Sequence, residues 1–179
     1  MILNERNNRH QQALYAAQQM MTAARTAPKG KGLDLIEIAL LTDEDIKLLS
    51  DEMYRLQQEN GLKFFLRDAE NILAAEVVLI IGSRSQTQGL NCNHCGFPTC
   101  TEKPTSVPCA INSVDIGIAV GSACATAADL RLDTRVMFSA GLAAQSLNIL
   151  GDGCGCVMAI PISIGSKNPF FDRRPRSAN

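Results

Sequence analysis

The chain has 179 residues, with 17 Lys and Arg, 18 Asp and Glu, two His and seven Cys. This length is enough for one domain to bury a core without disulfide bonds. Apolar residues make up 46% of the chain and charged residues 20%, which excludes a disordered or fibrous protein. The net charge of -1 argues against a general nucleic-acid binder.

The charges are unevenly distributed along the chain. Residues 1–32 carry a net charge of +4 and residues 165–179 a net charge of +3, whereas the residues between them carry -8. Basic ends suit contact with an anionic ligand such as a phosphate. A solvated basic tail is the alternative, and it is the preferred interpretation for residues 173–176 alone.

The N-terminus predicts no secretory signal, because it becomes polar and charged after three residues. The longest uncharged stretch of small and apolar residues, 116–128, is shorter than the roughly 20 residues that span a bilayer. We therefore expect a soluble, cytoplasmic protein with no membrane contact. In a reducing compartment, its seven cysteines are expected to be thiols or metal ligands.

Hydrophobic spacing predicts helices that alternate with strands, and no repeat or linker separates them. We therefore expect one domain, 1–179, with a layered mixed α/β (α+β) fold. In chain order the expected elements are a helix at about 5–27, a buried strand at 33–41, a helix from Thr42 to Gly61, a helix at 62–75, a buried strand at 77–81, an irregular segment at 83–112, a helix from Ser113 to Leu132, a strand at 135–138, a helix at 140–150 and a strand at 154–164.

The irregular segment 83–112 contains four cysteines with the spacing Cys92-x2-Cys95-x4-Cys100-x8-Cys109. So long a loop inside a compact domain is unusual unless it carries function. Closely spaced thiolates on a Gly- and Pro-rich chain can wrap a metal centre. Zinc sites usually combine two short Cys-x2-Cys pairs, and only one is present here, so the spacing favours an iron–sulfur cluster over zinc.

The remaining candidate ligands have structural explanations. Cys154 and Cys156 share a predicted strand face with apolar residues, so we expect core packing. Cys124 lies in the small-residue helix and is expected to pack there, and His94 is expected at the loop surface.

The loop sequence NCNHCGFPTCTEKPTSVPCAINSVDIGIAVGSA resembles the 4Fe-4S domain of ferredoxin-like proteins. The chain is more similar to a family of prokaryotic proteins described as containing a ferredoxin domain, and this resemblance extends to AARTAPKGKGLD and SKNPFFDRR. It implies that Cys92, Cys95, Cys100 and Cys109 ligate a 4Fe-4S cluster. The spacing to Cys109 is shorter than in many such domains, so the alternatives for the fourth ligand are Cys124, Cys154 and Cys156.

The order of elements around the loop resembles that of the nitroreductase-like flavoproteins. This resemblance implies a nitroreductase-like sheet with helices, into which the cysteine loop is inserted, and an intertwined homodimer with FMN at the subunit interface. It assigns the FMN phosphate to Arg6 or Arg9 near the start and to Lys167 or Arg173 near the end. Lys29 and Lys31 stand where those flavoproteins carry small polar residues.

The first functional hypothesis is an iron–sulfur redox protein that passes electrons to an unidentified redox partner, or to FMN in the same dimer as a flavin-dependent oxidoreductase. The alternative is a non-enzymatic module in which an iron–sulfur cluster or zinc has only a structural role and stabilises the fold of the loop. Small residues at Gly117, Gly121, Ala125 and Ala128 line one helix stripe, which supports the expectation of a homodimer.

Overall fold

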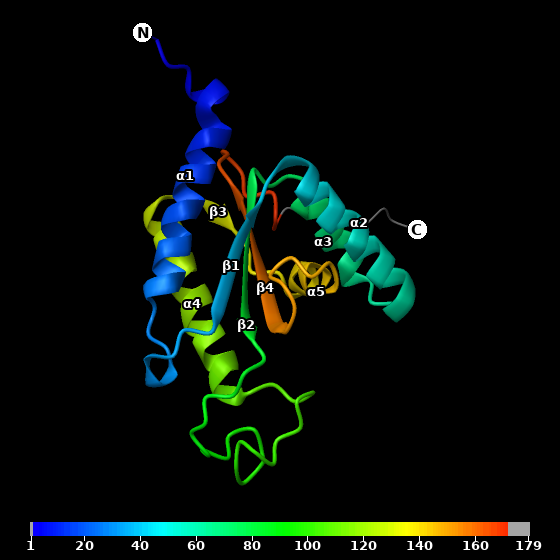
Figure 1. Ribbon diagram of the computed structural model, residues 1–179. Helices are drawn as coiled ribbons and strands as arrows, with labels where there is room; N and C mark the ends of the chain where they lie inside the picture. Colours follow the sequence, from blue (N-terminus) through cyan, green and yellow to red (C-terminus); the bar gives the residue numbers. More distant parts are fainter. Residues whose placement is uncertain (1, 172–179) are drawn as a thin grey trace.

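A four-stranded antiparallel sheet lies between two layers of helices in the computed structural model, which describes residues 2–171 (Figure 1). The sheet order is β1-β2-β4-β3. The strands are β1 (Ile36–Leu41), β2 (Val77–Arg84), β3 (Asp133–Thr134) and β4 (Cys154–Ser163). The helices are α1 (Glu5–Thr26), α2 (Asp43–Asn60), α3 (Phe64–Ile72), α4 (Ala110–Asp129) and α5 (Phe138–Ser146), with a 3-10 turn at Gly30–Gly32. This is the mixed α+β fold that the sequence predicts.

Strand β2 is central to both halves of the core. Val78 and Ile80 point into the cluster formed with α2, α3 and α5, whereas Leu79 and Ile81 point into the cluster formed with α1 and α4. Side chains alternate between the two faces of a strand, so a strand covered on both sides must be apolar at every position. Residues 77–81 form an unbroken apolar run because both faces of this strand are buried.

Helices α1 and α4 cover one face of the sheet and pack closely against each other (Figure 1). Their contact is made largely by alanines, and the Ser122 hydroxyl of α4 donates a hydrogen bond of 2.9 Å to the Ala23 carbonyl of α1. Among the described helices, α4 alone is long and apolar enough to cross a membrane by length and composition. Here its buried face is part of the protein core.

The opposite face of the sheet is covered by α2, α3 and α5. Helix α5 lies so close to β4 that a Cβ added at Gly141 would lie 2.0 Å from the Val157 carbonyl oxygen. Beside this contact, the buried Asp68 carboxylate accepts a hydrogen bond of 2.6 Å from Ser139 and pairs with Arg67 at 2.7 Å. Because α5 approaches the β4 backbone so closely, only glycine fits at position 141.

Several element boundaries differ from the sequence expectation by a few residues, and the largest differences lie at the third strand, the helix after it and the start of α4. The third strand is β3 at Asp133–Thr134, and the predicted segment 135–138 contributes only a single bridge between Met137 and Ala159. The following helix begins at Phe138, earlier than expected. Helix α4 begins at Ala110, and Ser113 lies inside it and donates back to the Cys109 carbonyl instead of capping the helix. Local capping rules missed this start because Cys109 takes the N-cap position.

Gly141→Ala should lower the free energy of unfolding by about 3 kcal/mol, because the new methyl group would overlap the β4 backbone. Urea unfolding followed by circular dichroism measures the change. Gly165→Ala is the matched control, since its Cβ would make only ordinary contacts of 3.6 Å or more, and it should change stability by less than about 0.5 kcal/mol. Equal effects of the two substitutions would contradict the close packing of α5 on β4.

Candidate metal centre

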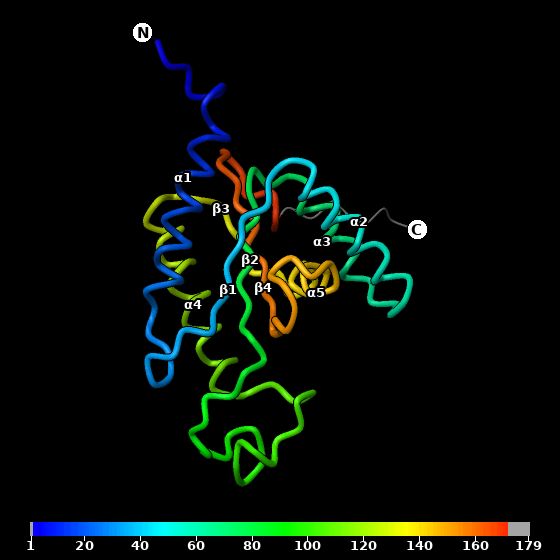
Figure 2. Tube along the Cα trace, viewed as in Figure 1, coloured from blue at the N-terminus to red at the C-terminus, as the bar shows by residue number. Residues whose placement is uncertain are grey.

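The cysteine-bearing loop runs from residue 85 to residue 109, between β2 and α4. It folds back on itself beyond the N-terminal end of α4, at the end of the molecule away from the chain's N-terminus (Figure 2). Several residues of the loop have positive φ angles, including Asn91 at 48° and Gly96 at 87°. These backbone reversals let a short chain segment turn around a common centre.

All four predicted ligands line one pocket within this loop. The lining residues of the pocket are Thr87, Gln88, Leu90, Asn91, Cys92, Asn93, Cys95, Phe97, Cys100, Lys103, Cys109, Ala110 and Ile111. Cys124, Cys154 and Cys156 do not line it, so the geometry favours Cys109 over these alternatives. Within residues 2–171, no three His, Cys, Asp or Glu side chains converge on the position of a single ion.

Hydrogen bonds within the loop hold its sulfur atoms in place. The Asn91 backbone N–H donates to the Cys100 sulfur at 3.4 Å, and the Asn91 side chain accepts from the Cys100 backbone N–H at 2.8 Å. The Gly96 N–H donates to the Asn93 carbonyl at 2.9 Å and closes the turn between Cys92 and Cys95. Amide donors near sulfur are a common feature of thiolate-ligated clusters.

Cys109 is the buried member of the four, with 7% of its surface exposed. Burial acts to raise the pKa of its thiol, but the backbone N–H groups of Gln88, Asn112 and Ile111, together with the Lys103 ammonium, outweigh it and hold this pKa below its usual value. The donor set therefore favours the thiolate, the form that binds metal.

Gln88 fastens the loop to the body of the protein. Its side-chain NH2 donates to Asn112 at 3.0 Å and to Asp115 at 3.2 Å, both on α4, and its backbone carbonyl accepts from the Lys31 ammonium at 3.1 Å. Asp115 also accepts from the Gly30 backbone N–H at 3.0 Å. One buried junction thus joins the loop, α4 and the segment that follows α1. Within residues 2–171, the Gln88 side-chain oxygen is buried and has no hydrogen-bond partner.

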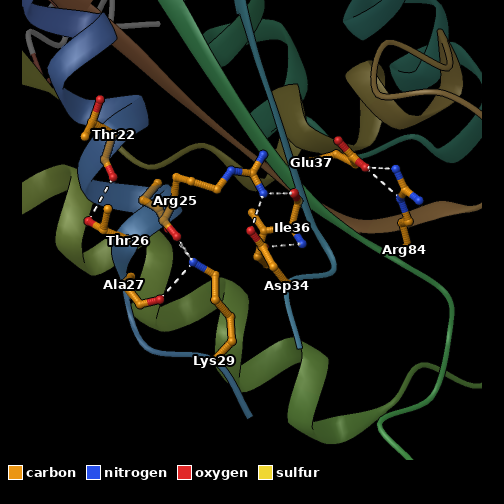
Figure 3. A network of polar contacts seen from close by, with 10 residues as sticks. Thr22, Arg25, Thr26, Ala27, Lys29, Asp34, Ile36, Glu37 and Arg84 are labelled. Atoms are coloured by element: carbon orange, nitrogen blue, oxygen red, sulfur yellow. Dashed lines mark hydrogen bonds and ion pairs between the residues drawn. The ribbon is translucent and has the colours of Figure 1, made fainter. Parts of the chain in front are cut away.

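The two lysines that depart from the flavoprotein pattern have structural roles here. The Lys29 ammonium donates to the Ala24 carbonyl at 3.0 Å and to the Ala27 carbonyl at 2.8 Å, and also contacts the Arg25 carbonyl (Figure 3). Burial lowers the pKa of Lys29. Lys29 therefore caps the C-terminus of α1, where a cation is favourable, while Lys31 reaches the cysteine loop. Sequence reasoning missed the Lys31 role because Gln88 is distant in the chain, and it missed the Lys29 role although the three carbonyls are local.

Of the residues predicted to hold an FMN phosphate, Arg6 and Arg9 lie far from the cysteines (Figure 1). Arg6 and Arg9 are in the first turns of α1, at the end of the molecule opposite the cysteine loop (Figure 1). Arg9 pairs with Glu5 at 3.0 Å. Lys167 is exposed in the segment after β4, and Arg173 lies outside the described residues. The assignment of these residues to a phosphate remains a prediction.

Asp115→Asn should lower the free energy of unfolding by about 1–3 kcal/mol and speed hydrogen exchange in residues 85–109, because an amide NH2 would face the Gly30 or Gln88 donor. Hydrogen-exchange mass spectrometry locates the effect. Asp129→Asn, at the exposed end of the same helix, is the control and should leave exchange in the loop unchanged. Unchanged exchange in the Asp115 variant would mean that the junction does not restrain the loop.

Comparison with known proteins places the chain in a family. Residues 105–173 match a family described as "Uncharacterized protein containing a ferredoxin domain (DUF2148)", a segment that includes Cys109 but not the three preceding loop cysteines. A protein of Archaeoglobus fulgidus, described as uncharacterised, is 38% identical over 186 residues, which cover 98% of this chain and all of that protein.

The fold is similar to that of FMN proteins of known structure. A nitroreductase with bound FMN from Desulfitobacterium hafniense aligns with a TM-score of 0.60 at 13% identity, over 92% of this chain and 82% of that one. An FMN-dependent nitroreductase from Clostridium difficile aligns with a TM-score of 0.55 at 15% identity, over 86% and 76%. At this level of identity the similarity shows the fold. The chain belongs to the family of proteins described as containing a ferredoxin domain, and it has the nitroreductase fold.

Proposed function

We propose that this protein is an iron–sulfur redox protein of a reducing, cytoplasmic compartment, which holds a 4Fe-4S cluster on Cys92, Cys95, Cys100 and Cys109. The observation that carries the proposal is the single loop pocket lined by all four cysteines. The ferredoxin domain in the family description agrees with it. A bound cluster would supply a one-electron carrier whose potential depends on hydrogen bonds to sulfur and on exposure to solvent.

The chain's own residues would hold the cluster and influence its potential. The Asn91 N–H donates to the Cys100 sulfur, and donors of this kind stabilise the more negative, reduced state. The buried Lys103 places a positive charge beside Cys109 and is held by the Pro104 and Val107 carbonyls. Cys92 is exposed, which gives a redox partner access to this side of the loop.

FMN is the electron acceptor or donor that we propose for the same protein, which would make it a flavin-dependent oxidoreductase. The support is the nitroreductase fold, since solved relatives of this fold are described as FMN proteins. Arg6, Arg9, Lys167 and Arg173 are the proposed phosphate contacts. This extension is independent of the cluster assignment.

We further propose a homodimer formed through the outer face of α4. Val114 is 55% exposed and Ile118 40% exposed on this face, although both are aliphatic. A Cβ added at Gly117 or Gly121 would meet nothing within 4 Å, so a second helix could approach the backbone closely. Burial of these residues against a second copy would remove apolar surface from water.

Cys95→Ser should abolish the cluster and leave much of the fold intact, because serine removes one sulfur ligand without changing the packing of the core. The measurement is the ultraviolet–visible spectrum of anaerobically purified protein together with its iron, sulfide and zinc content. The wild-type protein should hold about four iron atoms per chain and show a broad absorption band at about 400 nm that bleaches on reduction. Additional flavin bands would support the FMN proposal.

Cys124→Ser is the control for the cluster variant, because Cys124 lies on α4 away from the loop pocket, and it should retain full iron content. Full retention of iron in Cys95→Ser would overturn the ligand assignment. If the wild-type protein is colourless and holds about one zinc per chain, the result would favour the alternative of a structural zinc site.

Ile118→Glu should convert the dimer to a monomer, because a charge on the small-residue face of α4 would lose its hydration in a helix–helix contact. Size-exclusion chromatography with light scattering measures the mass. Leu48→Glu, at a 53% exposed position on α2, is the control and should remain dimeric. A monomeric wild type would remove the interfacial flavin site.

A further inference from the structure

A second cavity, of about 170 Å³, adjoins the cluster pocket at Cys109. Cys109 lines both, so the fourth proposed cluster ligand forms part of the wall between them. The cavity opens between the ends of β2 and β4 and the last part of the loop. Its lining residues are Ser83, Arg84, Ser85, Thr105, Ser106, Pro108, Cys109, Asn112, Gln145, Cys154, Gly155 and Cys156.

The chemistry of this lining is that of a hydrogen-bonding site with one positive charge. Four side chains carry hydroxyl groups and two carry amides, and none of the lining residues is Asp or Glu. Arg84 is the charged member. Glu37 on β1 binds the Arg84 Nε at 2.6 Å and also contacts Nη2 (Figure 3). This pair fixes the guanidinium at the end of β2 and leaves Nη1 for a ligand.

The backbone of β4 is distorted at this cavity. The ladder between β2 and β4 shifts register between Ile81 and Ser83, which makes a β-bulge at Cys156 and Val157. Cys156 has a φ of 51°, a left-handed conformation that is unfavourable for a non-glycine residue. Bulges often redirect side chains beside functional sites. The bulge also interrupts the simple strand alternation on which the sequence expectation of core packing for Cys154 and Cys156 was based.

The Cys156 thiol is partly exposed and lies 3.6 Å from the Ser113 hydroxyl in the first turns of α4. The Cys154 thiol donates to the Leu150 carbonyl at 3.4 Å. Burial, followed by Glu37, raises the pKa of the Cys154 thiol. Two free cysteines, Cys154 and Cys156, therefore line the cavity besides Cys109.

We propose that this cavity binds a small oxyanion, of the class of carboxylates or phosphate, next to Cys109. The Arg84 guanidinium provides the charge, and the remaining hydrogen bonds come from the Ser85, Thr105 and Ser106 hydroxyls and the Gln145 amide. The Ser83 hydroxyl and the Asn112 amide already donate to backbone carbonyls. A cavity of about 150 Å³ accommodates benzene, so this one suits a ligand of roughly six to eight non-hydrogen atoms. Binding itself depends only on this chain, whereas the role of the ligand as an electron-transfer substrate rests on the proposed iron–sulfur function.

The test is affinity labelling of the anaerobic, iron-loaded protein with iodoacetate and with its neutral analogue iodoacetamide. A thiolate attacks the methylene carbon of either reagent, a C–S bond forms, the C–I bond breaks and iodide leaves, while the thiol proton goes to solvent. Peptide mass spectrometry reports the rate at each cysteine. The ratio of the two rates at one cysteine cancels its thiolate fraction, so the ratio reports recognition of the carboxylate.

We expect the iodoacetate-to-iodoacetamide ratio at Cys156 to exceed that at Cys124, which lies outside the cavity, by about tenfold. Arg84→Gln should abolish this excess. The control Arg55→Gln should not change it, because Arg55 is also an exposed arginine held by glutamates but lies on α2. Acetate or inorganic phosphate, added as a competitor, should slow iodoacetate labelling, and the stronger competitor identifies the preferred oxyanion.

Any one of three results would overturn the proposal. These are equal ratios at Cys156 and Cys124, no labelling at either Cys154 or Cys156, and an excess that survives in Arg84→Gln. Iron analysis of the same samples separates this result from the proposed function. Full iron with no preference for iodoacetate refutes the oxyanion site alone. A preference for iodoacetate in a protein without iron or sulfide refutes the cluster and keeps the site.

Discussion

The buried carboxylate of Asp115 holds together the part of the structure on which the metal centre depends. It accepts from the Gly30 backbone and from the Gln88 side chain, which belong to segments far apart in the sequence. A carboxylate with 4% of its surface exposed is stable only when its hydrogen bonds are made, so the three segments are fixed together or not at all. The cysteine loop, which has few apolar residues of its own, gains its orientation from this junction.

The same junction explains how a flavoprotein-like fold accommodates a cysteine loop. The loop enters after β2 and leaves at the first residue of α4, so both ends of the insertion lie beside the Lys29–Gly32 segment. Lys31 contacts the base of the loop and Lys29 caps α1.

Cys109 connects the two cavities, and its position follows from α4. As the N-cap residue it cannot move without moving the helix, and α4 is packed against α1 and the sheet. The other three cysteines lie on a loop restrained mainly by its own hydrogen bonds. One rigid ligand and three adaptable ones would let the loop close around a cluster while the wall toward the Arg84 cavity stays in place.

The sequence by itself determined the alternation of helices and strands, the buried central strand and the four loop cysteines, because hydrophobic periodicity and cysteine spacing are local properties of the chain. The α+β fold was correct on that basis, and the family resemblance, which rested on quoted sequence motifs, agrees with the family match. The sequence did not reveal the N-cap role of Cys109, the lysine contacts, the bulge at Cys156 or the Arg84–Glu37 pair. The Lys31–Gln88 contact, the bulge at Cys156 and the Arg84–Glu37 pair join residues that are distant in the chain and become adjacent only after the sheet and helices have packed. The Lys29 contacts and the N-cap position of Cys109 are local, but they depend on where α1 ends and α4 begins, which hydrophobic periodicity does not specify to the residue.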